Sequence, residues 1–205
     1  MLFTIGHSTH RVEVFVERLH AYQITCLIDV RSSPYSRICP QFNKPVLSKI
    51  LQAEQILYAH MPDELGARRT EKAFLDADGK VDFEKVRNST LFKRGVERVK
   101  NGLVQGFQIG LMCAEANPMD CHRFSLIARG FSDAGVEVQH ILKDGSLISN
   151  ELLEEDLLAM YRSKLPTETL FSPAPTREEL LSIAYKLRNK DVAFSSLHQE
   201  EETDK

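Results

Sequence analysis

The chain has 205 residues, of which 42% are hydrophobic and 27% are charged, and its formal net charge is −3. This length fits one α/β-sized domain with a small appendage, and the hydrophobic fraction is sufficient for a buried core. The near-neutral charge excludes a wholly polybasic nucleic-acid binder, although it allows a local basic patch. No run of 18 apolar residues occurs, so the sequence predicts no membrane-spanning helix and no membrane partner.

The chain contains four cysteines, Cys26, Cys39, Cys113 and Cys121. So few cysteines do not support a disulfide scaffold. The first residues, MLFTIGHSTH, lack the basic and apolar regions of a secretory signal. We therefore expect a cytoplasmic protein with reduced thiols, which either pack in the core or take part in chemistry.

Strands and helices alternate in the first three quarters of the chain. Short apolar runs predict strands at residues 3–6, 25–30, 56–60, 107–113 and 136–142. Apolar residues at helical spacing predict helices over about 12–22, after Asn43, over 84–100 and over 121–134. The expected N-caps are Ser8 or Thr9 for the first helix and Asp120 for the last. Repeated strand–helix–strand units predict a three-layer α/β fold with a mainly parallel sheet flanked by helices.

The last part of the chain has a different character. A helix rich in glutamate and leucine is predicted over 150–164, and a linker with three prolines over 165–175. Thr176 and Glu179 fit a capping box that begins a helix to about residue 188. We therefore divide the chain into an α/β domain over 1–148, a helical extension over 149–190 and an acidic, flexible tail over 191–205.

Reactive side chains follow several of the predicted strands or begin the helix after residue 120. They are His7, Asp29, Arg31, Cys113, Glu115, Cys121, His122 and Arg123. Ligands of open parallel sheets bind outside the carboxyl ends of the strands. The sequence therefore predicts one site at that edge of the sheet.

The stretch from Cys113 to Arg123 is the most informative part of this set. Cys121 is expected in the first turn of a helix, where free backbone N–H groups and the helix dipole lower the pKa of a thiol. Cys121 is therefore the candidate nucleophile, with His122 or Glu115 as proton carrier. Cys113 would be a resolving thiol, a metal ligand or a packing residue. The alternative is that both cysteines only pack.

His7, Ser8 and Asp29 complete the candidate site. Gly6 allows a ligand to approach the backbone closely beside His7, and the Ser8 hydroxyl could hold an anionic group. Asp29 lies in a strand whose apolar neighbours imply burial, so it needs a partner such as Arg31 or His7. A catalytic role and a structural ion pair are both open for this aspartate.

The loop after the second strand is rich in hydrogen-bond donors, namely Arg31, Ser32, Ser33, Tyr35, Ser36 and Arg37. Such a loop suits a phosphate or another oxyanion, and Arg31, Arg37 and Arg123 are the candidate cations. Tyr35 could stack on a base. The leading hypothesis is an enzyme for an anionic substrate such as a nucleotide, a nucleic acid or a phosphorylated metabolite. An ordinary polar turn is the alternative for the serines.

Two other functions are open. Cys113, Cys121 and His122 could bind zinc or iron, but their C-x7-C-H spacing differs from paired zinc knuckles. Neighbouring residues at a helix start also point apart, so the leading interpretation assigns no metal and requires no cofactor.

Residues 85–100 carry six basic side chains and one acidic one, a net of +5, which fits either a nucleic-acid footprint or a solvated helix face. The sequence indicates no oligomeric state.

No G-x-G-x-x-G follows the first strand and no P-loop occurs, which disfavours a dinucleotide enzyme or a P-loop NTPase. The stretches TIGHSTH, LIDVRSSPYSR with PQFNK, YAHMPDELG, LMCAEANPMDCHR and HI…DG resemble the DUF488 family from the start to about residue 145. The resemblance implies a compact intracellular α/β domain whose signature positions are His7, the Asp29–Arg37 loop and the Cys113–Arg123 stretch. It implies no reaction, because the function of that family is unknown. The chain has Leu65-Gly66-Ala67 where the family usually has two glycines.

Overall fold

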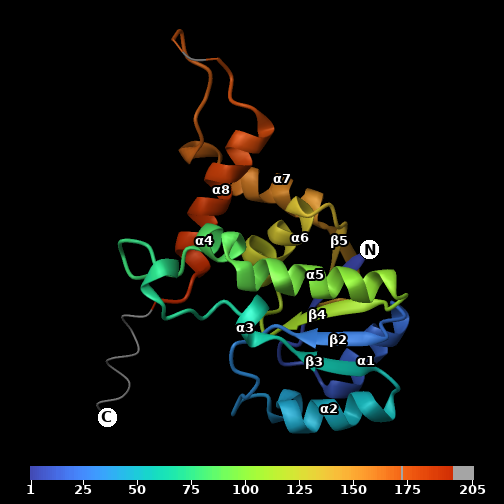
Figure 1. Ribbon diagram of the computed structural model, residues 1–205. Helices are drawn as coiled ribbons and strands as arrows, with labels where there is room; N and C mark the ends of the chain where they lie inside the picture. Colours follow the sequence, from blue (N-terminus) through green and yellow to red (C-terminus); the bar gives the residue numbers. More distant parts are fainter. Residues whose placement is uncertain (172, 196–205) are drawn as a thin grey trace.

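A computed structural model describes residues 1–171 and 173–195 of the chain (Figure 1). Its centre is a six-stranded sheet in the order β3-β2-β4-β1-β5-β6. The strands are β1 Leu2–Gly6, β2 Cys26–Asp29, β3 Leu57–His60, β4 Ile109–Cys113, β5 Val138–Ile141 and β6 Leu147–Ser149. The first five are parallel, and β6 pairs antiparallel with β5. The predicted α/β fold with a mainly parallel sheet is confirmed.

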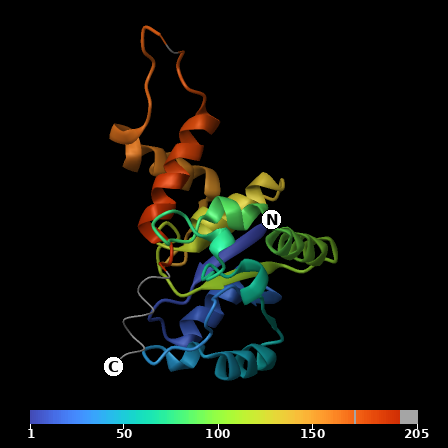
Figure 2. The ribbon, with the colours of Figure 1, turned by 60° about the vertical axis from the view of Figure 1, so that its left-hand side comes forward.

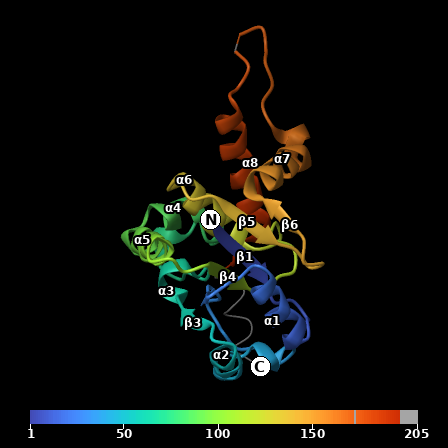
Figure 3. The same cartoon turned by 90° about the vertical axis from the view of Figure 1, so that its right-hand side faces the viewer.

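Helices cover both faces of this sheet (Figures 1 and 3). One face packs against α1 (Val12–Ala21) and α2 (Lys44–Ala53), through a cluster that includes Phe15 and Leu47. The other face packs against α4 (Phe83–Asn88), α5 (Thr90–Val104) and α6 (Arg129–Asp133). Since β1 and β4 are buried on both faces, each is almost wholly apolar in sequence.

The remaining elements are short or lie at the C-terminal side. Between β3 and α4 lies the short helix α3, and a π-helix runs directly into α6. The bounds are α3 Pro62–Leu65, the π-helix Arg123–Ala128, α7 Asn150–Tyr161, α8 Arg177–Val192, and 3-10 helices at Pro40–Phe42, Lys72–Phe74 and Arg162–Lys164. Among the described residues, no helix is long and apolar enough to cross a membrane.

The helices α7 and α8 pack against each other and against the π-helix. Phe124 of the π-helix shares one buried cluster with Leu153 and Leu157 of α7 and with Tyr185 of α8. The described residues of the connection between the two helices, 165–171 and 173–176, project away from the sheet (Figures 1 and 2). The capping box at Thr176 is present as predicted.

The chain returns to the α/β part after α8. The carbonyl of Phe194 accepts a hydrogen bond from the backbone N–H of Val81, at 3.0 Å. This contact brings residues 192–194 beside the carboxyl edge of the sheet. Residues 196–205 of the predicted acidic tail lie outside the described residues.

Three predicted helix boundaries are wrong. The N-cap of α1 is Arg11 and not Ser8 or Thr9. Ser8 has a left-handed backbone (φ 47°), and its N–H donates a hydrogen bond to the carbonyl of Ala114. The predicted helix over 84–100 is two helices, α4 and α5, since the Ser89 hydroxyl caps a new helix by accepting from the N–H of Phe92.

The last predicted N-cap, Asp120, is also wrong. The residue that precedes the π-helix is His122, and the Asp120 carboxylate instead accepts hydrogen bonds from Asn117 and from Arg188 of α8. Cys121 therefore lies before the helix rather than in its first turn. The predicted end at Gly135 is confirmed by its left-handed backbone, φ 75°.

Candidate functional site

The carboxyl ends of β2, β4 and β1 lie side by side, with β4 in the middle. Gly6 pairs with Cys113, and Asp29 pairs with Met112. The backbone N–H of His7 continues this ladder by donating to the carbonyl of Cys113, at 2.9 Å. The predicted gathering of side chains at this edge is therefore what the structure shows.

Asp29 and Arg31 form a buried ion pair at the end of β2. The Asp29 carboxylate accepts from the Arg31 backbone N–H, Nε and Nη2, at 3.0, 2.9 and 2.6 Å, and from the Tyr58 hydroxyl at 2.7 Å. Arg31 Nη2 also donates to the carbonyl of Phe42. Four donors occupy the carboxylate, which favours a structural role for Asp29 over a catalytic one.

His7 is part of the same network. Its Nδ1 donates to the carbonyl of Ser8 at 2.8 Å, and its Nε2 accepts from Arg31 Nη1 at 3.1 Å. The ring stacks on Phe42, with centroids 4.4 Å apart. Burial lowers the pKa of His7, in keeping with a neutral ring. Both nitrogens are thus engaged within the fold, so His7 supports the edge rather than offering a free base.

Cys113, Cys121 and His122 form the chemically distinctive cluster of the site. His122 Nδ1 lies 3.6 Å from Cys113 Sγ and 3.7 Å from Cys121 Sγ, and all three atoms lie within 4.8 Å of one another. Both cysteines are free and buried. The expectation that Cys121 and His122 point apart is wrong, because Cys121 lies in a bend before the helix.

The two thiols differ in their tendency to ionise. A hydrogen bond from Cys121, the His122 ring and the charge of Arg123 hold the pKa of Cys113 well below its ordinary value. Burial and the neighbouring Cys113 sulfur raise the pKa of Cys121. The electrostatics therefore favour Cys113 as the ionised thiol, where the sequence pointed to Cys121.

Arg123 lies wholly beneath the loop that follows β4. Its Nη2 donates to the carbonyl of Ala116 at 2.7 Å, while its Nε and Nη1 have no partner among the described residues. The loop and Arg123 approach Gly6 so closely that a Cβ there would lie 1.7 Å from the carbonyl oxygen of Glu115. Arg123 is thus a buried cation beside the sulfurs and not a surface anion contact.

A cavity of about 470 Å³ opens above this cluster, and we call it the edge pocket. It is lined by Arg31, Ser32, Ser33, Tyr35, Ser36, Ala67, Arg68, Cys113, Ala114, Glu115, Asp120, Cys121, His122, Val192 and Phe194. All three members of the cysteine–histidine cluster therefore face the same cavity. A hollow of about 580 Å³ between α4, α5, α6 and α8 contains no cysteine or histidine in its lining.

The model of a family described as "Domain of unknown function DUF488" matches residues 11–129, more than half of the chain. The chain belongs to the DUF488 family. No curated protein and no solved structure matches it. The matched region contains the Asp29–Arg31 pair and the cluster with Arg123, while α7, α8 and Phe194 lie beyond it.

Three residues of the DUF488 site escape prediction from the sequence. The Tyr58 hydroxyl donates to Asp29 from the neighbouring strand. The only sequence signal for this contact is the strand period, which puts every second residue of Leu57–His60 on the same face of the sheet. Arg68 and Phe194 enter the edge pocket from an irregular segment and from the chain after α8, where no motif marks them. Of the predicted anion contacts, Ser32 and Tyr35 line the edge pocket, whereas the exposed Arg37 and the half-buried Ser8 do not.

Proposed function

We propose that this DUF488 protein is an enzyme that acts on a small anionic substrate in the edge pocket, with the Cys113–Cys121–His122 cluster as its reactive centre. The observation that carries the proposal is that one cavity is lined by this cluster and by Arg68, a guanidinium without a carboxylate partner among the described residues. Ionisable groups with strongly shifted pKa values that line a cleft are more frequent at functional sites than elsewhere.

Arg68 is the anion contact that the geometry favours. Its side chain is exposed, and its guanidinium lies over the Phe194 ring, 5.3 Å from the centroid. Arg31 contributes less, because four of its five side-chain N–H groups already bond Asp29, Phe42 and His7. The hydroxyl of Ser33 lies in the same lining. Guanidinium and hydroxyl donors together suit a phosphate or carboxylate group.

The aromatic side chains of the edge pocket indicate a substrate with a flat apolar part. Tyr35 is 61% exposed although it lines the cavity, and Phe194 lies on the same lining. A ring stacked on either side chain, with its anionic group on Arg68, would fit a nucleotide. The exposed carboxylate of Glu115 is the group that can exchange a proton with this substrate.

A non-catalytic nucleic-acid binder has less support. Several basic side chains of residues 85–100 are neutralised within the fold, since Glu64 pairs with both Arg94 and Arg98. Arg87 has only 18% of its side chain exposed and donates to the carbonyl of Ser125. The net charge of +5 counted from the sequence of residues 85–100 therefore overstates the positive charge that this face offers to a phosphate backbone.

Calorimetric titration with inorganic phosphate and with adenosine monophosphate tests the proposal. Loss of charge-assisted hydrogen bonds should make Arg68→Ala bind these anions about 10- to 100-fold more weakly than the wild type. Arg37→Ala is the matched control and should bind like the wild type, because Arg37 is also exposed but is not among the residues that line the pocket. Wild-type protein that binds neither anion, or Arg68→Ala that binds both unchanged, would contradict the proposal.

A further inference from the structure

We propose that Cys113, Cys121 and His122 bind one zinc ion whose fourth coordination position opens into the edge pocket. Use of this ion in catalysis rests on the function proposed above, whereas binding of the ion does not. The three ligands come from the end of β4 and from the two residues before the π-helix.

The distances from His122 Nδ1 to the two sulfurs match those of a tetrahedral zinc site. Zn–S bonds of about 2.3 Å and Zn–N bonds of about 2.0–2.1 Å place each sulfur about 3.5–3.6 Å from a ligating nitrogen. The observed separations between His122 Nδ1 and the two sulfurs are 3.6 and 3.7 Å. The two nitrogen–sulfur separations therefore have the values that the ion requires. The two sulfurs lie within 4.8 Å of each other, and they need to be about 3.8 Å apart when the ion is bound.

Hydrogen bonds from Cys121 and from His122 Nδ1 to the Cys113 sulfur account for two of the three contacts, but not for the contact between Nδ1 and the Cys121 sulfur. One imidazole nitrogen has a single lone pair or a single proton, so Nδ1 can make one good hydrogen bond and not two equivalent ones. Two sulfurs nevertheless lie at nearly equal distances from it. A cation at the centre of the three atoms satisfies both contacts at once.

A buried cation without a carboxylate partner among the described residues lies beside the two sulfurs. Arg123 is wholly buried and forms no ion pair among those residues, so its charge needs a negative neighbour. A thiolate at either sulfur supplies that charge, and zinc binds cysteine in this ionised form.

The ligand types select a borderline-soft metal rather than magnesium or calcium. Because Cys113 is the thiol that ionises more readily, binding to the ionised form releases one proton. Zn²⁺ plus Cys–S⁻, Cys–SH and a neutral imidazole give a Zn²⁺-bis(thiolate)-imidazole centre and one released proton. The three ligands leave one tetrahedral position, and all three line the edge pocket. Three protein ligands and an open position are typical of catalytic zinc.

Zinc stoichiometry of the full chain tests the proposal. After incubation with zinc and removal of free metal, elemental analysis should find about one ion per chain in the wild type. Cys113→Ser, Cys121→Ser and His122→Gln should each bind zinc at least about tenfold more weakly. Cys39→Ser is the matched control and should keep the ion, because that buried thiol donates to the carbonyl of Ser8 instead.

Cobalt provides a second measurement that needs only the wild type. Co²⁺ added to the metal-free protein should give a thiolate-to-cobalt charge-transfer absorption and the intense visible bands of a tetrahedral site. Failure to take up either metal, or Cys113→Ser binding zinc as tightly as the wild type, overturns the proposal. Because Arg68 is not a ligand, Arg68→Ala should lose anion binding and keep zinc, so failure of the metal proposal and failure of the proposed function are distinguishable.

Discussion

At the level of single residues, Asp29 shows how a buried charge is held at the edge of the sheet. Its carboxylate accepts from Arg31 and Tyr58, while Arg31 also holds His7 and the carbonyl of Phe42. The pair therefore connects β1, β2 and β3 just below the edge pocket. The ion pair matters for stability mainly because the loss of either partner would leave the other as a buried charge without compensation.

Asp29→Asn should therefore be costly. It leaves the Arg31 guanidinium buried without its carboxylate, and we expect a loss of about 3–5 kcal/mol in the free energy of unfolding. Tyr58→Phe removes one donor to the carboxylate but keeps the ion pair, so it should cost only about 1.5–3 kcal/mol. Urea titration followed by circular dichroism measures both. Equal losses in the two variants would show that the ion pair is not the main contribution.

At the level of elements, Gly6 determines how closely the loop after β4 approaches the end of β1. A Cβ at this position would lie 1.7 Å from the Glu115 carbonyl oxygen and 2.5 Å from Arg123 Nη1. Gly6→Ala must therefore displace the backbone of the loop at Glu115. We expect the free energy of unfolding to fall by about 1–3 kcal/mol and zinc binding to become weaker. Gly102→Ala in α5 is the control, because its Cβ would meet only the Ile109 side chain at 2.9 Å. Thermal unfolding and zinc titration of both variants test this, and equal behaviour would contradict it.

The elements also show what a sequence can predict. The five parallel strands are predictable because each is a short, largely apolar run. The strand β6 has three partly exposed residues and leaves no periodic signal, so it was missed. The break at Ser89 was missed because serine is compatible with a helix interior and with a cap. The π-helix differs from an α-helix in its hydrogen bonds, for which the sequence has no signature.

The candidate site was predictable to a similar extent. Its location follows from the carboxyl ends of parallel strands, and Cys113, Cys121 and His122 do meet there. Which arginine faces the cavity was not predictable, because that depends on the partners of each one. Arg123 is buried under a loop, and Arg68 reaches the edge pocket from a segment with no periodic pattern.

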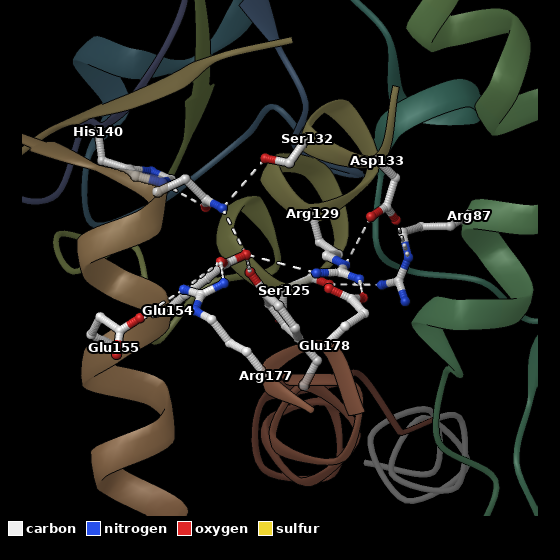
Figure 4. Close-up of polar contacts among 12 residues, drawn as sticks. Arg87, Ser125, Arg129, Ser132, Asp133, His140, Glu154, Glu155, Arg177 and Glu178 are labelled. Carbon is white, nitrogen blue, oxygen red and sulfur yellow. Dashed lines mark hydrogen bonds and ion pairs between the residues drawn. The ribbon is translucent and has the colours of Figure 1, made fainter. Parts of the chain in front are cut away.

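At the level of the whole molecule, a polar network connects the sheet to α7 and α8 (Figure 4). His140 of β5 accepts from the Thr4 hydroxyl through Nδ1 and contacts the Asn150 side chain through Nε2, at 2.7 and 3.2 Å. Asn150 then donates to Glu154, which pairs with Arg177 and lies near Arg129. The C-terminal helices are therefore attached through buried hydrogen bonds as well as through the apolar cluster around Phe124.

This network should make stability depend on the protonation of His140. Burial lowers the pKa of His140 to about 3, and the nearby Arg123 charge acts in the same direction, while the Asn150 side chain opposes it. In the unfolded chain this histidine has a pKa of about 6.5. The contribution of neutral His140 to the free energy of unfolding is therefore complete above that pH and is lost as the pH falls toward 3. At pH 5 the loss should be about 2 kcal/mol.

Comparison with His140→Gln isolates this contribution. Glutamine keeps a donor and an acceptor but does not titrate, so its free energy of unfolding should fall less than that of the wild type between pH 7 and pH 5. The lowered pKa values of His7 and His10 affect both proteins alike and cancel in the comparison. Urea titrations at several pH values give the two slopes. Parallel curves would mean that His140 takes up a proton without disturbing the contacts that join β5 to α7.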